Sequence, residues 1–388
     1  MAVTLGSTRL LASGRLKGLR VGVVANPASV DHAFVHIVDR VRAAEGVTLA
    51  AIFGPQHGFR SDLQDNMIET PHAEDLTRRV PVYSLYSETR EPTAEMLAGL
   101  DVLVIDLQDI GARIYTFIYT MANCLRACGR HGVPVIVCDR PNPIGGVEVE
   151  GETLVRGFES FVGLFPIPMR HGLTIGELAR LFNDQFALGA DLEVVTMEGW
   201  RRADYADDCR MPWVMPSPNM PTLDSAVVYP GTVLLEGTLA SEGRGTTRPF
   251  ELVGAPWVRA ETYADRLNAH GLPGAIFRPA VFEPTFQKHR GVTCEGCQIH
   301  VTDRAAFTPV VTGVAVIEEL RRAEPSSFAW RPPPYEYEHR LMPIDILAGS
   351  SVMRESLERG ASAETIAAGW RDDEAAFRAL RAPYLLYA

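Results

Sequence analysis

The sequence predicts an α/β protein in which a parallel-sheet domain, residues 1–225, is followed by a smaller α+β domain, residues 226–388. Two observations support this fold class. In the first 140 residues, short β-branched runs alternate with helix-like stretches, and near residue 225 this alternation gives way to glycine-broken runs. The length of 388 residues exceeds the usual size of one domain, so two domains are expected.

The strands of the first domain are expected at residues 19–26, 47–53, 80–86, 101–108 and 133–139. Each run is almost wholly apolar, which is typical of parallel strands that helices cover on both faces. Helices are expected in the intervening stretches HAFVHIVDRVRAA and YTFIYTMANCLRACGRHG. A later helix is expected to start at Thr174, because Thr174 and Glu177 have the spacing of a capping box, and the strand DLEVVTME follows it.

The second domain begins with strand-like runs that glycines interrupt, in AVVYPGTVLLEGTLASEGRGTTRPFELVGAPW. Short strands (GAIFRPAVF, CQIHVTD) and helices (TGVAVIEELRRA, AETIAAGWRDDEAAFRALR) make up the rest. Since no long Ser/Gly-rich or charged linker separates the two domains, we expect them to be closely joined. A cleft between two such domains is a common place for a small-molecule site.

Composition narrows the function classes. The formal net charge of -11 disfavours nucleic acid and anionic membranes as partners. The first residues lack the uninterrupted apolar core of a signal peptide, and no later segment reaches about 18 apolar residues, so a cytoplasmic protein is expected. The six cysteines are expected to be buried free thiols; Cys294 and Cys297 form one CxxC, but no second pair completes a zinc site.

Polar clusters follow the expected strands. In open α/β sheets ligands bind outside the carboxyl ends of the strands, so these clusters should converge in space. Ordinary turn chemistry explains any single cluster but poorly explains five. The clusters lie at Asn26–Pro27, Pro55–Gly58, Ser87–Arg90, Asp106–Arg113 and Asp139–Asn142.

Neither a GxGxxG nor a GxxxxGK[ST] motif accompanies this edge, which disfavours nucleotide cofactors, and no cofactor is expected. His57, His171, Asp65 and Asp106 have the chemistry of metal ligands, but their spacing matches no metal motif, so no metal is expected either.

Several carboxyl groups on the edge suit glycoside cleavage, which commonly uses one acid to protonate the leaving oxygen and a second as base or nucleophile. N-acetylated sugars offer another route, in which the acetamido oxygen attacks the anomeric carbon and the protein supplies one acid. For three of these groups a structural role competes: Glu242 with Arg244 or Arg248, Asp139 with Arg140, and Asp109 with Arg113 as a helical pair. The acidic candidates are Asp65, Glu69, Asp106, Asp109, Asp139 and Glu242.

Long motifs resemble a known family, the NamZ-type exo-β-N-acetylmuramidases. They are GPQHGF, VLVIDLQDIGARIYTF, DRPNPIGG, MRHGLTIGELA, WVMPSPNMPT, YPGTVLLEGT, SEGRGTTRPFE and GAPW, and the likeness extends from about residue 18 to the C-terminus. The resemblance implies a Rossmann-like N-terminal domain, a smaller α+β C-terminal domain and a site in the cleft between them. It also implies release of N-acetylmuramic acid, or a related N-acetylated amino sugar, from the non-reducing end of peptidoglycan fragments, without a nucleotide cofactor.

The chain departs from this family at Gln56. The resemblance implies a glutamate there, in a PEHG motif, as the proposed catalytic residue. An amide cannot donate a proton at neutral pH or act as a base of carboxylate strength. Three explanations follow: Glu242 or Asp106 supplies the proton, Gln56 orients the acetamido group in an assisted mechanism, or the protein binds a muropeptide-like sugar without hydrolysis or cleaves a different glycoside.

We therefore predict a glycosidase acting on a small saccharide, with a non-hydrolytic sugar-binding protein as the alternative. The catalytic candidates are Glu242, Asp106, Gln56 and His57. One of Arg244, Arg170 and Arg140 is expected to bind the lactyl carboxylate of the sugar, because the guanidinium fork donates two parallel hydrogen bonds. The predicted substrate-binding residues are Asp65, Asn66, Arg113, Tyr115, Asp139, Arg140, Asn142, Arg170, His171, Ser217, Asn219, Arg244 and Thr246.

Overall fold

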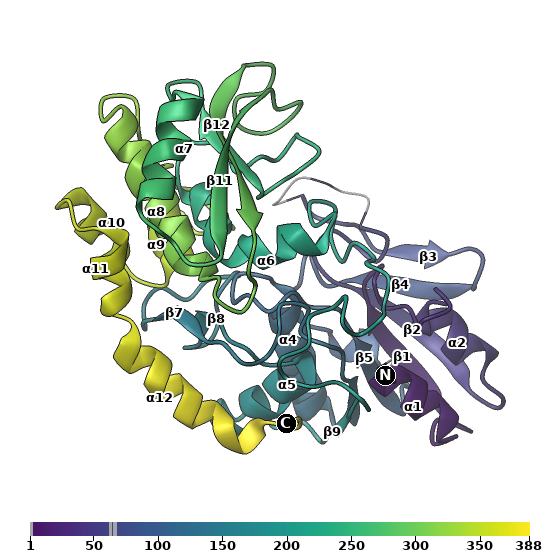
Figure 1. Ribbon diagram of the computed structural model, residues 1–388. Coiled ribbons are helices and arrows are strands. Elements are labelled where there is room, and N and C mark those ends of the chain that lie inside the picture. Colours follow the sequence, from purple (N-terminus) through teal and green to yellow (C-terminus); the bar gives the residue numbers. More distant parts are fainter. Residues whose placement is uncertain (1–2, 62–63, 65–67) are drawn as a thin grey trace.

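A seven-stranded sheet forms the centre of the N-terminal half in this computed structural model, which describes residues 3–61, 64 and 68–388 (Figure 1). The strand order is β3-β4-β2-β1-β5-β6-β9, and the pairs are parallel except for β3 with β4. The strands are β1 (Arg20–Ala25), β2 (Thr48–Gly54), β3 (Ala73–Asp75), β4 (Val80–Ser84), β5 (Val102–Asp106), β6 (Val135–Cys138) and β9 (Leu192–Val195).

Helices cover both faces of this sheet, as the apolar strands predict. Val23 and Val104 pack toward α1 (Gly6–Ala12) and α2 (Ile37–Ala43), whereas Val24 and Ile105 belong to the core beneath α4 (Phe117–His131) and α5 (Ile175–Gln185). The short α3 (Ala94–Leu97) precedes β5, and the pair β7 (Glu150–Thr153) and β8 (Pro168–Arg170) lies between β6 and α5. The predicted α/β class is confirmed.

Local signals explain where the helices begin and end. The capping box predicted at Thr174 and Glu177 is present at the start of α5. The helix α4 ends at Gly132, whose φ of 68° lies in the left-handed region that glycine tolerates. The stretch that starts at residue 32 becomes helical only at Ile37, because the Asp31 side chain accepts hydrogen bonds from the backbone of Ala33 and Val35 and holds a turn there.

The second half contains a three-stranded antiparallel sheet of order β10-β12-β11, with helices beside it. Its elements are α6 (Leu223–Thr232), the 3-10 helix η1 (Val233–Gly237), β10 (Leu252–Ala255), α7 (Ala260–Ala269), β11 (Ala275–Phe282), β12 (Cys294–Val301), α8 (Pro309–Ala323), α9 (Pro343–Ala348), α10 (Val352–Glu358), α11 (Ala363–Ala368), α12 (Arg371–Arg381) and the 3-10 helix η2 (Ala382–Tyr384). The domain boundary at residues 225 and 226 stays a prediction.

The run AVVYPGTVLL is helical, not strand-like as its β-branched residues indicate. It forms the end of α6 and the start of η1 and is buried throughout. Two glycines let α6 approach α8: a Cβ on Gly231 would lie 1.8 Å from the Pro309 carbonyl oxygen, and a Cβ on Gly313 would lie 2.2 Å from the Gly231 carbonyl oxygen. Close helix packing therefore outweighs the local β-propensity.

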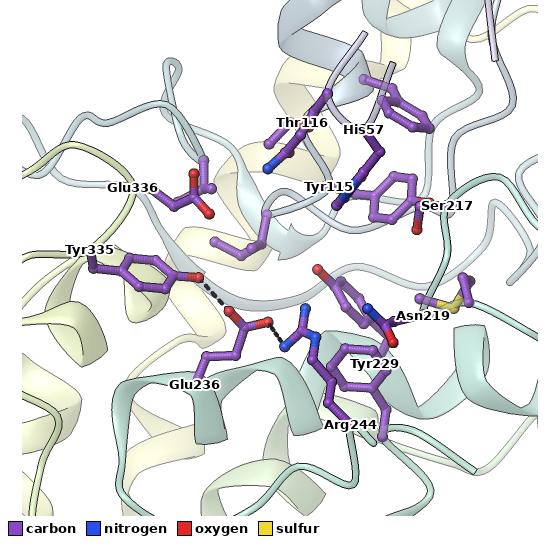
Figure 2. A pocket seen from close by; sticks show the side chains of 16 residues that line it. His57, Tyr115, Thr116, Ser217, Asn219, Tyr229, Glu236, Arg244, Tyr335 and Glu336 are labelled. Atoms are coloured by element: carbon purple, nitrogen blue, oxygen red, sulfur yellow. Dashed lines mark hydrogen bonds and ion pairs between the residues drawn. The ribbon is translucent and has the colours of Figure 1, made fainter. Parts of the chain in front are cut away.

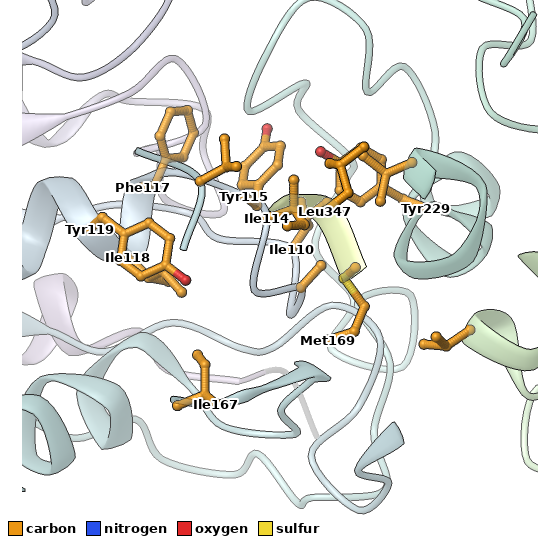
Figure 3. Close-up of a cluster of buried hydrophobic side chains, with 14 of the residues drawn as sticks. Ile110, Ile114, Tyr115, Phe117, Ile118, Tyr119, Ile167, Met169, Tyr229 and Leu347 are labelled. Carbon is orange, nitrogen blue, oxygen red and sulfur yellow. The ribbon is translucent and has the colours of Figure 1, made fainter. Parts of the chain in front are cut away.

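One hydrophobic core joins the two halves of the chain. Figure 3 shows Tyr229 and Leu347 from the second half beside Tyr115, Ile114 and Met169 from the first. The last helix, α12, runs back along β7 and β8 to the N-terminal half, where the chain ends near α5 and β9 (Figure 1). The close joining that the absence of a linker predicts is therefore observed.

Within the described part of the chain, no helix has the length and apolar character needed to cross a membrane. The six cysteines are buried free thiols. Cys294 and Cys297 both lie on β12, and burial raises the pKa of each thiol, so neither is an activated thiolate. Among the described residues, no group of three or more His, Cys, Asp or Glu side chains could hold a metal ion.

Candidate active site

A pocket lies where the two halves of the chain meet (Figure 2) and encloses about 510 Å³, counting the part that opens to solvent. His57, Tyr115 and Thr116 approach it from the N-terminal half, and Glu236 and Arg244 lie on the opposite side. The lining residues are Gln56, His57, Ile114, Tyr115, Thr116, Phe117, Val162, Ser217, Asn219, Met220, Tyr229, Glu236, Arg244, Phe250, Tyr335 and Glu336.

Gln56 and His57 reach the pocket from the turn that follows β2. The Gln56 amide is buried; its Oε1 accepts a hydrogen bond from Thr116 Oγ1 at 2.7 Å, and its Nε2 donates to Tyr86 Oη at 3.4 Å. His57 has a φ of 69°, in the left-handed region that non-glycine residues seldom adopt. Strain of this kind concentrates at functional sites, because the surrounding structure must hold it in place.

Among the described residues, two carboxyl groups line the pocket, and both come from the second half of the chain. Glu236 accepts a hydrogen bond from Arg244 Nη1 at 2.6 Å and another from Tyr335 Oη at 2.8 Å, as the dashed lines in Figure 2 show. Glu336 accepts a hydrogen bond from Tyr86 Oη at 3.2 Å. Burial, with a contribution from the nearby Glu236, raises the pKa of Glu336 to about 7, so a large share of this carboxyl is protonated at neutral pH.

Arg244 Nε is buried and has no hydrogen-bond partner among the described residues, and Tyr115 Oη has only the Ser217 side chain beside it. Both residues are 7% exposed. Buried polar groups in folded proteins are almost always hydrogen-bonded, so a ligand or water is expected to satisfy Arg244 Nε. The Arg244 guanidinium also lies 4.9 Å from the centre of the Phe250 ring, which fixes its plane in the pocket.

The structure brings six of the residues predicted from sequence to this pocket: Gln56, His57, Tyr115, Ser217, Asn219 and Arg244. The predicted contacts Asp65 and Asn66 lie outside the described residues. The remaining predicted residues lie outside the pocket, where they make structural contacts.

Glu242 lies behind Arg244 and does not line the pocket. Burial alone would raise its pKa, but Lys288 and Arg244 outweigh burial and hold the pKa at about 2. Its carboxylate contacts Lys288 Nζ at 2.7 Å and Arg244 Nη1 at 3.1 Å. A group this acidic is ionised at neutral pH, so we do not retain Glu242 as the proton donor. Thr246, in the same loop, donates a hydrogen bond to the Gly243 carbonyl oxygen.

Asp106, the other carboxyl predicted to donate the proton, forms a fully buried pair with Arg140 at the end of β5. Arg140 Nε and Nη2 donate to the two carboxylate oxygens at 2.6 and 2.8 Å. Such bidentate pairing occupies both carboxylate oxygens and the guanidinium fork. Asp106 and Arg140 therefore stabilise the sheet edge, and neither residue lines the pocket.

Asp139 and Asn142 organise the start of α5. Asp139 accepts hydrogen bonds from Gly176 N at 2.8 Å and Thr174 Oγ1 at 2.8 Å, and from Tyr387 Oη at 2.5 Å. Asn142 Nδ2 donates to the Leu173 carbonyl oxygen at 3.0 Å. Both residues are buried and lie outside the pocket.

Arg113 serves as a clamp between the two halves. Its guanidinium donates to four backbone carbonyl oxygens, two from residues 152 and 167 and two from residues 347 and 348. It does not form the helical ion pair with Asp109 that the spacing suggests, because α4 begins only at Phe117.

Arg170 and His171 are also buried outside the pocket. Arg170 donates to the Ile144 carbonyl oxygen at 2.7 Å. Burial, together with Arg381 and Arg170, lowers the pKa of His171 to about 3, so this histidine is neutral in the folded protein. Of the three arginines predicted for the lactyl carboxylate, only Arg244 lines the pocket.

Sequence reasoning missed Thr116, Tyr229, Glu236, Tyr335 and Glu336 as site residues. Glu236 could have been found from the sequence, because it is the single acid in the apolar run VVYPGTVLLEG. A carboxylate buried in such a run needs a charged or hydrogen-bonding partner. Tyr335 and Glu336 follow a proline run in PPPYEYEHR, which reads as an ordinary loop without knowledge of the fold.

The fold and the pocket together define a class: a two-domain α/β protein whose interdomain pocket combines paired carboxyl groups, an arginine and aromatic rings, as in proteins that bind and cleave saccharides. Comparison with known proteins identifies the family. The model for the N-terminal part of exo-beta-N-acetylmuramidase NamZ matches residues 21–224, and the model for its C-terminal part matches residues 227–387. The chain belongs to this family of glycosidases.

Individual relatives agree with the family match. The chain is 46% identical over 373 residues to the peptidoglycan beta-N-acetylmuramidase NamZ of Bacillus subtilis (strain 168), which covers 96% of this chain and 88% of the relative. Two crystal structures of DUF1343 family proteins from Bacteroides fragilis NCTC 9343 are similar over 100% of this chain and 99% of theirs. One has a TM-score of 0.91 at 36% identity, and the other has a TM-score of 0.78 at 26% identity.

Proposed function

We propose that the protein is an exo-β-N-acetylmuramidase that hydrolyses N-acetylmuramic acid from the non-reducing end of peptidoglycan fragments, with the interdomain pocket as its active site. One observation carries the assignment to this pocket: the buried, unpartnered Arg244 Nε lies in the same cavity as two carboxyl groups. Family membership supports the reaction class.

Arg244 is the group that distinguishes N-acetylmuramic acid from N-acetylglucosamine in this proposal. The two sugars differ by the lactyl ether, which carries a carboxylate. Arg244 Nη1 already donates to Glu236 and Glu242, which leaves Nε and Nη2 to meet the lactyl carboxylate. The rings of Tyr115, Tyr229 and Phe250 offer apolar faces to the sugar.

Hydrolysis also needs a group that stabilises positive charge at the anomeric carbon. Glu236 suits this role, because its two oxygens already accept hydrogen bonds from Arg244 and Tyr335 as a carboxylate does. Gln56 suits a different role. Its amide is held by Thr116 and Tyr86, and an oriented amide can bind the acetamido group of the substrate.

The test is release of free sugar from the disaccharide N-acetylmuramyl-β-1,4-N-acetylglucosamine. We expect equal amounts of N-acetylmuramic acid and N-acetylglucosamine. The isomer with N-acetylglucosamine at the non-reducing end is the matched control and should stay intact.

The amide at position 56 favours one alternative, a sugar-binding protein that does not hydrolyse. That alternative predicts no turnover together with stabilisation by the disaccharide, by about 2–3 kcal/mol at a hundredfold excess over the dissociation constant. Such a result would replace the hydrolase assignment, whereas equimolar release would exclude the alternative.

A further inference from the structure

We propose that Glu336 donates the proton to the leaving oxygen in this pocket. The inference rests on the proposed function and assigns a catalytic residue to it. Two acids, Glu236 and Glu336, are the only Asp or Glu side chains among the described residues of the lining. Gln56 carries an amide, which has no proton to give at neutral pH.

Glu336 is connected to Gln56 through one tyrosine. Gln56 Nε2 donates to Tyr86 Oη at 3.4 Å, and Tyr86 Oη donates to Glu336 Oε2 at 3.2 Å. The Glu336 carboxyl therefore lies on the same side of the pocket as the turn after β2, one hydroxyl away from the amide. Thr116 Oγ1 completes the chain by donating to Gln56 Oε1.

A tight hairpin turn presents Glu336 to the pocket. The backbones of Tyr335 and Glu338 exchange two hydrogen bonds of 2.9 Å, and the two residues between them, Glu336 and Tyr337, have φ values of 44° and 68°. Positive φ at both central residues is the geometry of a type I′ turn, which normally selects asparagine and glycine. A glutamate and a tyrosine in this conformation have a strained backbone. Such strain is typical of positions whose side chains have a function.

The two carboxyls of the pocket have environments that separate their roles. Glu336 is 3% exposed, and burial and the adjacent Glu236 raise its pKa to about 7. Glu236 instead binds the Arg244 guanidinium directly. Paired carboxyls with contrasting environments are the usual way in which one acid keeps its proton while the other stays charged. The charged and titratable groups around Glu336 include Glu236, Tyr86, Arg244, Arg331, Tyr229 and Tyr335.

The step balances as a hydrolysis. The bond between the anomeric carbon and the bridging oxygen breaks, and its electron pair stays on that oxygen, which takes the proton of Glu336. A water molecule bonds through its oxygen to the anomeric carbon, and the proton that it loses restores the Glu336 carboxylic acid. The products are one N-acetylmuramic acid and the shortened fragment.

Leaving-group dependence tests this role directly. In Glu336→Gln we expect the rate on the disaccharide to fall by about 100- to 10,000-fold. On 4-nitrophenyl N-acetyl-β-muramide, whose leaving group needs no proton, the same variant should keep most of the unaltered rate. Glu338→Gln is the matched control, because Glu338 lies in the same turn and its carboxylate accepts a hydrogen bond from the Arg340 backbone N–H. This variant should keep the unaltered rate on the disaccharide.

The unaltered protein offers a second test that needs no variant. A donor must be protonated, so the rate on the disaccharide should fall as the pH rises through about 7. The rate on the aryl glycoside should lack this fall. An equal fall on both substrates would overturn the assignment.

Failure of the inference differs from failure of the proposed function. If the unaltered protein releases sugar and Glu336→Gln releases it equally fast, Glu336 is not the donor and the function stands. The donor is His57 if Glu336→Gln loses its rate equally on both substrates while His57→Gln loses its rate on the disaccharide and keeps its rate on the aryl glycoside. If the unaltered protein cleaves neither substrate, the proposed function itself fails.

Discussion

At the scale of single residues, Arg244 determines the electrostatics of the pocket. Its Nη1 contacts Glu236 on the pocket side and Glu242 behind it. Burial would lower its pKa, but Glu236 and Glu242 outweigh burial and raise it above its ordinary value, so the guanidinium stays charged. One cation thus balances the carboxylate that faces the sugar and still offers Nε to a ligand.

Replacing Arg244 by lysine keeps the charge and removes the planar fork. We expect kcat/KM for the N-acetylmuramyl disaccharide to fall by about 10- to 100-fold, the usual worth of a charge-assisted hydrogen bond. The affinity for the N-acetylglucosaminyl isomer, which the protein is expected not to cleave, should change much less. Arg248→Lys, an exposed arginine of the same loop, is the control. Equal losses on both sugars would show that Arg244 does not recognise the lactyl group.

Glu242 contributes stability with a defined pH dependence. Its pKa of about 2 in the folded protein lies below the ordinary 4.5, so its contribution is present above pH 4.5 and is lost as the pH falls toward 2. Glu242→Gln leaves Lys288 buried without its carboxylate, which should cost about 3 kcal/mol at pH 7.

Thermal unfolding at pH 7 and pH 3 measures this contribution. The difference between Glu242→Gln and the unaltered protein should shrink at pH 3, and the exposed Glu283→Gln should behave like the unaltered protein at both pH values. A pH-independent difference would contradict the ion-pair explanation.

At the scale of elements, the sheet could be predicted from sequence because buried parallel strands are nearly continuous apolar runs. The run AVVYPGTVLL could not, since β-branched residues favour strands and only the packing of α6 on α8 makes it helical. For the same reason, half of the site could not be predicted from the sequence. Glu236 lies on η1 after this run, and Glu336 lies in a hairpin turn whose position depends on the whole fold.

The crossing of α6 and α8 gives a prediction for the glycines. Gly313→Ala places a methyl group 2.2 Å from the Gly231 carbonyl oxygen, so the helices must separate. We expect a loss of about 1–3 kcal/mol in the free energy of unfolding, although alanine is the better helix former. Gly369→Ala, whose Cβ would come no closer than 3.2 Å to another atom, should cost much less. Denaturant unfolding compares the two, and equal stabilities would contradict the close contact.

At the scale of the whole molecule, the C-terminus completes the N-terminal domain. Arg381 donates to the carbonyl oxygens of His171, Gly172 and Val147, and Tyr387 donates to Asp139. Together with the Arg113 clamp, these contacts connect the last residues of the chain to the sheet that holds Gln56 and His57. We therefore expect the two halves of the chain that build the pocket to unfold together.

Deleting residues 371–388 tests this dependence. The deletion removes α12, the contacts of Arg381 and the Tyr387 hydrogen bond, so we expect the unfolding midpoint to fall by about 10 °C or more. Tyr387→Phe, which removes one hydroxyl, should lower it by a few degrees at most. An N-terminal sheet that unfolds at an unchanged temperature without these residues would contradict the account.

The interdomain pocket is proposed to bind N-acetylmuramic acid for hydrolysis. The most direct measurement is a crystal structure of Glu336→Gln with the N-acetylmuramyl disaccharide. We expect the lactyl carboxylate on Arg244 Nε and the bridging oxygen within hydrogen-bond distance of residue 336. A disaccharide bound at another place, or one whose bridging oxygen lies far from both Gln56 and residue 336, would contradict the claim.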